Sequence, residues 1–195
     1  MGKLDGRVAV VTGGGRGIGR AICLGYAKEG ADVIVNYASK DQPAREVVEM
    51  VQGMGRKAVA VKANVAVRAD VERIMQTAIE NFGKIDILVN NAGATKPNML
   101  YKMTEEQWDE VVDVHLKRPF LCIQAASKYM MEKKSGKIIN VTSVAGLVGT
   151  KGQINYSAAK GGILSLTKSA ARVGSGRRGA YRYSLGQSGG TTGRG

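Results

Sequence analysis

The sequence predicts an α/β fold in which helices cover both faces of a parallel sheet. Short apolar runs rich in β-branched residues alternate with segments of helical apolar spacing as far as residue 171. The expected strands are apolar at most positions, which is typical of a sheet buried on both faces. A strand, a helix and a second strand in succession give parallel neighbours, because the helix returns the chain to the same end of the sheet.

The individual elements follow from the apolar pattern and from the residues that end it. Strands are expected at residues 7–12, 32–37, 57–63, 85–90 and 137–141. Helices are expected at residues 18–27, 44–54, 69–82, 104–131 and 153–171. The helix that begins at Thr104 opens with a capping box to Gln107. Pro119 lies inside the same helix, so a bend is expected there.

Length and composition are those of one globular domain. The chain has 195 residues, of which 44% are hydrophobic and 23% charged, so a disordered chain is excluded. The two cysteines, Cys23 and Cys122, lie in apolar helical patterns, which excludes a disulfide framework. No apolar stretch approaches the roughly 20 residues that span a bilayer, and the N-terminus leads directly into a strand. We therefore expect a cytoplasmic protein without a membrane segment or signal peptide.

The positive charge is unevenly distributed. The formal charge is +13, and residues 172–195 supply five arginines and no acid to it. Eight of the 27 glycines fall in residues 173–195, where helical and strand periodicity stops. We expect residues 173–195 to form an irregular, disordered Gly/Arg-rich tail behind a mildly basic domain of residues 1–172.

A glycine-rich segment at residues 12–19 follows the first expected strand and opens the first helix. Glycine lets the backbone approach a pyrophosphate closely, and the N-terminus of a helix offers free N–H groups to it. The glycine spacing is G-x-x-x-G-x-G, and a P-loop would need Lys-Ser or Lys-Thr where Arg20-Ala21 stand. The alternative is a tight strand-to-helix turn that binds no ligand. The candidate nucleotide-binding residues of this loop are Gly13, Gly15, Arg16, Gly17, Ile18 and Gly19.

The end of the second expected strand bears on which dinucleotide binds. An acid at this place would accept a hydrogen bond from the ribose 2′-hydroxyl of NAD. No acid stands here before Asp41. Arg16 in the loop, with Ser39 or Lys40 nearby, could instead hold a 2′-phosphate. The sequence therefore favours NADP over NAD, with Asn36 and Ser39 among the candidate contacts.

Three residues further along the chain have the pattern of acid–base chemistry. Tyr156 and Lys160 are four residues apart, so they share one face of the last expected helix. A lysine cation near a phenol stabilises the phenolate, so that the tyrosine can act as a general acid or base. Ser143 ends the fifth expected strand and could donate a hydrogen bond to a substrate oxygen. The alternative is a surface Tyr–Lys pair without chemistry, but its setting in a nucleotide-binding α/β sheet favours a site.

The order and spacing of these motifs resemble the short-chain dehydrogenase/reductase family over about residues 5–172. The residues that carry the resemblance are Thr12–Gly19, Asn64-Val65, Asn90-Asn91-Ala92-Gly93, Ser143 and Tyr156 to Lys160. Residues 152–156 look further like those of the 3-oxoacyl-[acyl-carrier-protein] reductases. The resemblance implies a Rossmann-like doubly wound parallel sheet with strand order 3-2-1-4-5, lacking the family's usual last two strands. It also implies hydride transfer between NADP(H) and a carbonyl or secondary alcohol, with a small molecule or a 3-oxoacyl thioester as substrate.

The resemblance also implies a role for each matching residue. Tyr156 would give a proton to the carbonyl oxygen, Ser143 would orient that oxygen, and Lys160 would assist Tyr156 and hold the nicotinamide ribose. The residues expected to lie by the adenine or under the cofactor are Asn64, Val65, Asn91, Ala92 and Gly93. A family homotetramer built partly on the long helices is implied, and no metal site is expected.

Two departures from the family pattern stand out. His115 is the only histidine and occupies a place where the family has a proton-relay Asn. It could serve in a relay or bond a backbone carbonyl, and the sequence leaves both open. The resemblance ends near Arg172, so we expect a chain that is C-terminally truncated or frame-shifted there. The fifth strand would then have an open edge, and turnover would be weak or absent.

Two other functions and one partner remain open. The chain could be a dinucleotide-binding module without catalytic turnover. Tyr181, Arg182 and Tyr183 interleave aromatic and basic side chains as single-strand binders do, but so short a segment makes nucleic acid a disfavoured partner. A basic helix end could face an acidic acyl carrier, and its candidate residues are Lys128, Lys133 and Lys134.

Overall fold

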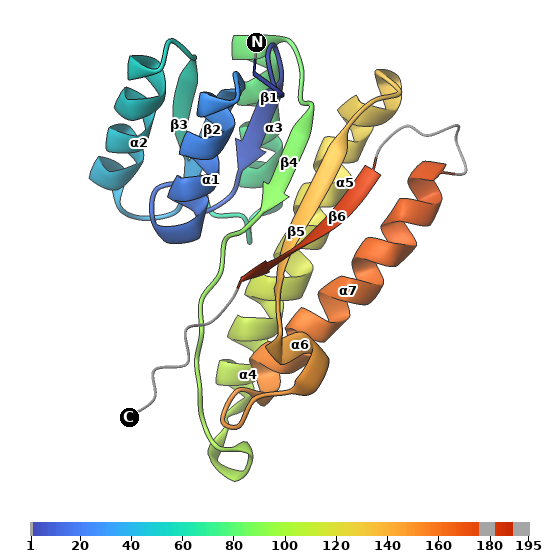
Figure 1. Cartoon of the computed structure of the whole chain (residues 1–195). Coiled ribbons are helices and arrows are strands. Elements are labelled where there is room, and N and C mark those ends of the chain that lie inside the picture. The colour runs from blue at the N-terminus through green and yellow to red at the C-terminus, as the bar shows by residue number, and fades with distance from the viewer. Residues whose placement is uncertain (1, 176–181, 189–195) are drawn as a thin grey trace.

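The computed structural model describes residues 2–175 and 182–188, which form one parallel sheet with helices on both faces (Figure 1). The strands are β1 (Val8–Val11), β2 (Asp32–Tyr37), β3 (Ala58–Lys62), β4 (Ile87–Asn90), β5 (Lys137–Ser143) and β6 (Arg182–Ser188). They lie in the order β3-β2-β1-β4-β5-β6, so the predicted order 3-2-1-4-5 is confirmed. From β1 to β3 the strands are added on one side of β1, and from β4 onward they are added on the other side. In doubly wound folds, ligands bind at this switch point between β1 and β4.

The sheet separates the apolar core into two layers, each covered by helices. They are α1 (Gly17–Lys28), α2 (Asp41–Gly53), α3 (Arg68–Phe82), α4 (Glu105–Val112), α5 (Arg118–Glu132), α6 (Ala145–Val148) and α7 (Ile154–Ser175), with a 3₁₀ turn at Leu100–Lys102. Residues of α1 and α2 pack on one face of the sheet, and residues of α3 and α5 pack on the other. Among the residues described, no helix is long and apolar enough to cross a membrane.

The long helix predicted from Thr104 is present, but a π-helical segment divides it into two α-helices. The capping box is confirmed, because Thr104 Oγ accepts from the Gln107 N–H at 3.3 Å and the Gln107 side chain accepts from Thr104 N–H at 3.2 Å. A π-helical segment, Asp113–Lys117, then separates α4 from α5. Pro119 follows at the start of α5 and has no N–H to donate to the His115 carbonyl, so the regular hydrogen-bond ladder is interrupted at this place.

The structure corrects the prediction of an irregular tail over residues 173–195. Helix α7 continues to Ser175, and β6 pairs in parallel with the whole of β5, from Lys137↔Arg182 to Ser143↔Ser188. The predicted open edge at β5 is therefore wrong. An edge strand offers a row of unpaired N–H and C=O groups, and these can pair with an extended segment whatever its periodicity. The rest of the tail, predicted to be disordered, lies outside the described residues.

Candidate functional site

Tyr156, Lys160 and His115 come together although they lie on different elements. Tyr156 and Lys160 face the same side of α7, and the Lys160 Nζ atom lies 5.6 Å from the centre of the Tyr156 ring. His115, in the π-helical segment, meets the Tyr156 ring edge-on, with ring centres 4.9 Å apart and planes at 89°. Ser143 ends β5, and its Oγ accepts from the Ala145 N–H at the start of α6. Ser143 is the last residue of β5, and Lys160 bonds the Val141 carbonyl two residues earlier, so this group lies at the carboxyl end of β5.

Lys160 is buried and held in one position. Its Nζ donates to the Val141 carbonyl at 2.5 Å, and its own carbonyl accepts from Thr142 Oγ at 3.0 Å. Helix α6 packs tightly on α7 here, because a Cβ added to Gly146 would lie 2.5 Å from the Lys160 carbonyl carbon. Burial lowers the pKa of Lys160 to about 8, so the ammonium is charged at neutral pH and loses its proton just above it.

His115 is a neutral side chain bonded to the backbone. Only 5% of the residue is exposed, and Nε2 lies 2.6 Å from the Ala94 carbonyl oxygen. A carbonyl only accepts, so Nε2 carries the proton and Nδ1 is left as an acceptor, with no partner among the described residues. Burial first, and then the charge of Lys160, lower the pKa of His115 to about 4. The backbone bond is thus one of the two roles that the sequence leaves open.

His115 also ties the loop after β4 to Tyr156. A Cβ on Gly93 would lie 2.6 Å from Cε1 of the His115 ring, so the imidazole packs directly on the backbone of this loop. The ring therefore touches Gly93 on one side and Tyr156 on another. The buried His115 side chain therefore contacts both the loop predicted to lie under the cofactor and the predicted acid–base residue.

The glycine-rich loop has a conformation that requires glycine. Gly13 and Gly17 have φ of +64° and +53°, in the left-handed region that other residues rarely adopt. A Cβ on Gly19 would overlap the Gly13 carbonyl oxygen and lie 2.6 Å from Nδ2 of Asn91. The loop thus folds back closely on the first turn of α1, whose free N–H groups and positive dipole end suit a phosphate. Arg16 and Ile18 are exposed beside it.

Thr12 and Asn91 join this loop to the end of β4. Thr12 Oγ accepts from the N–H groups of Asn91 and Ala92 at 3.0 and 3.1 Å. In return, Asn91 Nδ2 donates to the carbonyls of Thr12 and Gly13 at 3.1 and 3.3 Å. The sequence pointed to Asn91 and Ala92 but not to Thr12 as a supporting residue. The feature that could have indicated this role of Thr12 is a hydroxyl directly after an apolar strand.

The comparison with known families agrees with this arrangement. A family model described as short chain dehydrogenase matches residues 7–177. The chain belongs to the short-chain dehydrogenase family. The match ends close to Arg172, where the sequence motifs also end.

Two relatives and a solved structure support the same assignment. The chain is 47% identical over 172 residues to a 3-oxoacyl-[acyl-carrier-protein] reductase of Synechocystis, covering 88% of this chain and 70% of that protein. It is 49% identical over 164 residues to the 3-oxoacyl-[acyl-carrier-protein] reductase FabG of Staphylococcus aureus, covering 84% and 67%. A short chain dehydrogenase from Mycobacterium avium superposes with a TM-score of 0.87 at 42% identity, covering 95% of this chain and 70% of that one.

Family membership makes the chain an oxidoreductase with a nicotinamide dinucleotide as its cofactor. The residues present fit such a group, because the loop turns through left-handed Gly13 and Gly17 to the first turn of α1, and the space beside Gly17 is open. Among the predicted contacts, Asn64 is exposed after β3 and Val65 is buried. Ser39 is exposed between β2 and α2.

Asn36 lies beneath the loop rather than open to a ligand. Its Nδ2 donates to the Ala63 carbonyl at 2.9 Å and to the Val61 carbonyl at 3.3 Å, and its Oδ1 accepts from the Gly13 N–H at 3.4 Å. The residue is 2% exposed. Its amide is committed to the backbone, which favours support of the glycine loop over the predicted direct contact with the cofactor.

Asn155 is a supporting residue that the sequence analysis missed. It is fully buried, and its Nδ2 donates to the carbonyls of Lys96 and Gln107 at 3.1 and 2.9 Å. Its Oδ1 accepts from the Tyr156 N–H at 2.8 Å. One side chain therefore holds the start of α7 to α4 and to the loop after β4. Its position directly before Tyr156 was the available signal.

Asn155→Ala is expected to lower the free energy of unfolding by about 2–4 kcal/mol, because it removes three part-buried hydrogen bonds between this side chain and the backbone. Urea unfolding monitored by circular dichroism measures this change. Asn98→Ala is the matched control, since Asn98 also bonds backbone and side chain but in an exposed setting. Equal losses for the two variants would contradict a special role of Asn155.

His115 is expected to make stability fall in acid. Its folded-state pKa, about 4, is below the ordinary 6.5, so the unfolded chain binds a proton between these values and the folded chain does not. Stability is therefore complete above pH 6.5 and falls as the pH drops to about 4, by on the order of 3 kcal/mol. Unfolding of the wild type and His115→Asn at pH 7 and pH 4.5 measures the difference. A constant gap between them would contradict the lowered pKa.

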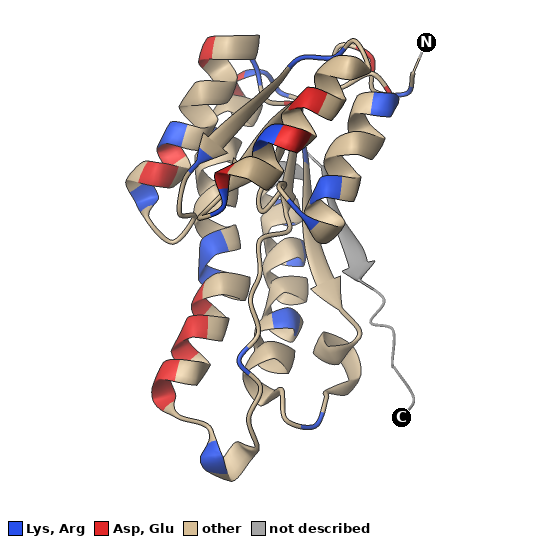
Figure 2. Ribbon diagram, turned by 90° about the vertical axis from the view of Figure 1, so that its left-hand side faces the viewer, with Lys and Arg blue, Asp and Glu red and all other residues tan. Residues whose placement is uncertain are grey.

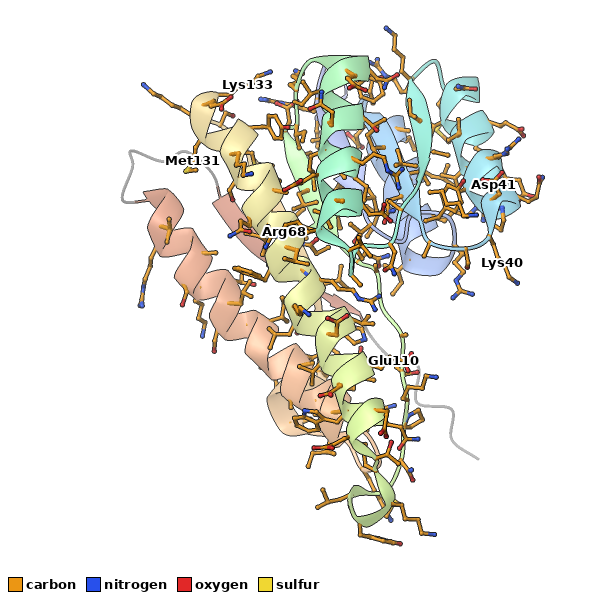
Figure 3. The ribbon with its side chains drawn as sticks, turned by 180° about the vertical axis from the view of Figure 1, so that it is seen from behind. Lys40, Asp41, Arg68, Glu110, Met131 and Lys133 are labelled. Carbon is orange, nitrogen blue, oxygen red and sulfur yellow. The ribbon has the colours of Figure 1, made fainter. Side chains whose placement is uncertain are left out.

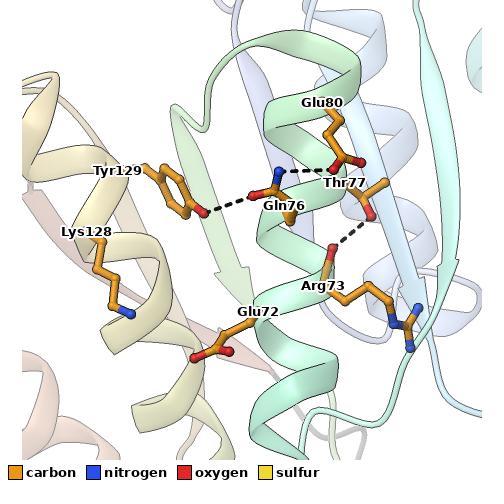
Figure 4. A pocket seen from close by; sticks show the side chains of 7 residues that line it. All are labelled: Glu72, Arg73, Gln76, Thr77, Glu80, Lys128 and Tyr129. Atoms are coloured by element: carbon orange, nitrogen blue, oxygen red, sulfur yellow. Dashed lines mark hydrogen bonds between the residues drawn. The ribbon is translucent and has the colours of Figure 1, made fainter.

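A groove of about 750 Å³ lies elsewhere, between α3 and α5 (Figure 4). Its polar side chains bond one another: Gln76 donates to Glu80 at 3.0 Å, and the Tyr129 hydroxyl donates to Gln76 at 3.4 Å. None of the predicted catalytic or cofactor residues lines it. Lys128 lines this groove, and Lys133 donates to the Gly83 carbonyl at the end of α3.

Acidic residues gather on a different element from these lysines. Asp and Glu residues follow one side of α4 in Figure 2, and they are Glu105, Glu106, Asp109 and Glu110. The predicted basic face for an acidic carrier consists of Lys128, Lys133 and Lys134. These residues lie at the C-terminal end of α5, whereas the acidic residues lie on α4, which precedes it. The start of α4 and the C-terminal end of α5 thus carry opposite charge.

Proposed function

We propose that this chain transfers a hydride between NADP(H) and a carbonyl or secondary alcohol, with a 3-oxoacyl thioester as substrate. The observation that carries the proposal is the buried contact of Tyr156 with Lys160 and His115, beside the loop that joins β4 to the glycine cradle. The two relatives named as 3-oxoacyl-[acyl-carrier-protein] reductases support this choice of substrate.

The bound cofactor would be held by the glycine loop at its phosphates, and by Asn91 to Gly93 and Lys160 near the reacting end. When bound, it supplies or accepts the hydride. Tyr156 donates its phenolic proton to the carbonyl oxygen during reduction, and Ser143 donates a hydrogen bond to the same oxygen. The Lys160 ammonium stabilises the phenolate that Tyr156 becomes. In the oxidative direction each proton moves the opposite way.

The preference for NADP rests on the residues around the end of β2. No acid stands at the strand end itself, while Arg16, Ser39 and Lys40 are exposed close to the glycine loop and the start of α2. A 2′-phosphate would add charge-assisted hydrogen bonds with these groups. An acyl carrier could meet the basic residues of α5, and a homotetramer and a cytoplasmic location remain expectations from the sequence.

The test separates binding from chemistry. NADPH is titrated into the purified full chain by nucleotide fluorescence, and its oxidation is then followed with a 3-oxoacyl thioester under single-turnover conditions, which detect even slow transfer. We expect binding together with oxidation, and the rate of oxidation tests the weak turnover expected from the sequence. Binding without any oxidation would favour the second candidate, a dinucleotide-binding module. Absence of binding would contradict both.

A further inference from the structure

The acid nearest to the end of β2 is already paired inside the chain. Asp41 is the first residue of α2. Its Oδ1 accepts from the hydroxyl of Tyr37, the last residue of β2, and its Oδ2 lies 2.6 Å from Nε of Arg45, one turn further along α2. Each carboxylate oxygen therefore has one strong donor. In Figure 3, Asp41 and Lys40 lie side by side at the outer end of α2.

This pairing lies close to the proposed phosphate cradle. A Cβ on Gly15 would lie 3.4 Å from the backbone nitrogen and Cβ of Ala44, so the glycine loop packs on the first turn of α2. Tyr37 comes from the strand whose end faces the ribose of a dinucleotide in folds of this kind. Asp41 is thus the carboxylate best placed to meet that ribose or a phosphate on it.

The partners of Asp41 also keep it ionised and engaged. The hydrogen bond from Tyr37, and then the charge of Arg45, hold the pKa of Asp41 below its usual value. The same hydrogen bond raises the pKa of Tyr37, so the phenol stays protonated and remains a donor. A carboxylate in this state is neutralised by Arg45 and is less available as an acceptor for a ribose hydroxyl.

We propose that Tyr37 and Arg45 mask Asp41, and that this masking sets the preference of the site for a 2′-phosphorylated dinucleotide. The inference rests on the proposed function, because it concerns the ribose of the same cofactor. An unmasked carboxylate would repel a 2′-phosphate and would accept from the 2′-hydroxyl of NAD. With the carboxylate masked, the remaining charges of Arg16 and Lys40 favour the phosphate.

The decisive experiment unmasks the acid and then removes it. The dissociation constants of NADPH and NADH are measured by fluorescence titration of the full chain at low ionic strength, where exposed charges are least screened. Arg45→Gln is expected to weaken NADPH by about tenfold and to change NADH by less than about twofold. Adding Asp41→Asn to Arg45→Gln should restore NADPH to within about threefold of the wild type, because the exposed carboxylate is gone.

Glu46→Gln is the matched control. Glu46 is an exposed acid on α2, one position after Arg45, and its carboxylate accepts a hydrogen bond from Gln42 at 3.3 Å. Its removal changes the net charge by the same amount as Asp41→Asn, so it should not restore NADPH binding in the Arg45→Gln background. Tyr37→Phe should weaken NADPH in the same direction as Arg45→Gln, but by less, because no charge is removed.

Two outcomes would overturn the inference while leaving the proposed function intact. If the double variant stays as weak as Arg45→Gln, Arg45 contacts the phosphate itself and masking is not its role. If the wild-type chain binds NADPH and NADH equally, there is no preference for masking to set. A wild-type chain that binds neither nucleotide would instead contradict the proposed function, and the inference with it.

Discussion

Gly19→Ala is expected to weaken nucleotide binding by at least about a hundredfold, whereas Gly25→Ala in the same helix should leave binding unchanged. A Cβ at Gly19 would overlap the Gly13 carbonyl and press on the Asn91 amide. Gly13 belongs to the turn that presents the N–H groups of α1 to a phosphate, and Asn91 holds this turn from the end of β4. The loop would have to open, and the cradle would lose its shape.

Alanine at the two glycines is also expected to change the free energy of unfolding in opposite directions. Nothing lies within 4 Å of a Cβ at Gly25, so alanine there should raise the free energy of unfolding by about 0.5–1 kcal/mol through helix propensity alone. Alanine at Gly19 should lower it by about 1–3 kcal/mol, because the clash is with backbone that cannot move alone.

Denaturant unfolding and NADPH fluorescence titration of both variants measure these effects. Tight NADPH binding by a folded Gly19→Ala protein would contradict the placement of the cofactor on this loop. A destabilised Gly25→Ala protein would contradict the packing of α1. The pair therefore tests the loop without relying on catalytic turnover.

The sheet could be predicted from the sequence because its strands are buried on both faces. Residues 8–11 and 33–35 are wholly apolar, and this signal does not depend on which other strands lie beside them. β6 could not be predicted in the same way. Its formation rests on the free edge of β5, which is a tertiary feature, and residues 182–188 lack an apolar run.

The residues of the site likewise divide into those that the sequence identifies and those whose role depends on tertiary contacts. Ser143, Tyr156, Lys160 and the glycines are recognisable because their chemistry or backbone freedom demands those residue types at that spacing. The supporting roles of Thr12, Asn36 and Asn155 could not be predicted, because an amide or hydroxyl in a sequence gives no sign of which distant carbonyl it will meet. The π-helical segment before Pro119 belongs to this second group as well, since proline predicts an interruption but not its form.

Tyr156→Phe is expected to reduce the single-turnover rate of NADPH oxidation by about 10²–10⁴-fold, because it removes the proton donor while keeping the ring. The edge-on packing against His115 uses the ring and not the hydroxyl, so the fold and the affinity for NADPH should stay within about twofold of the wild type. A fall in rate at constant affinity identifies a loss of chemistry rather than of binding.

Tyr129→Phe is the matched control for this substitution. The Tyr129 hydroxyl also donates a hydrogen bond, to Gln76, but it lies in the groove between α3 and α5 and away from Lys160. Its loss should leave the rate unchanged. Tyr156→Phe retaining more than about a tenth of the wild-type rate would mean that another group supplies the proton, since general-acid catalysis contributes at least about a hundredfold. Ser143, whose hydroxyl is the other donor proposed for the carbonyl oxygen, would then be the next group to examine, with the double variant Tyr156→Phe/Ser143→Ala.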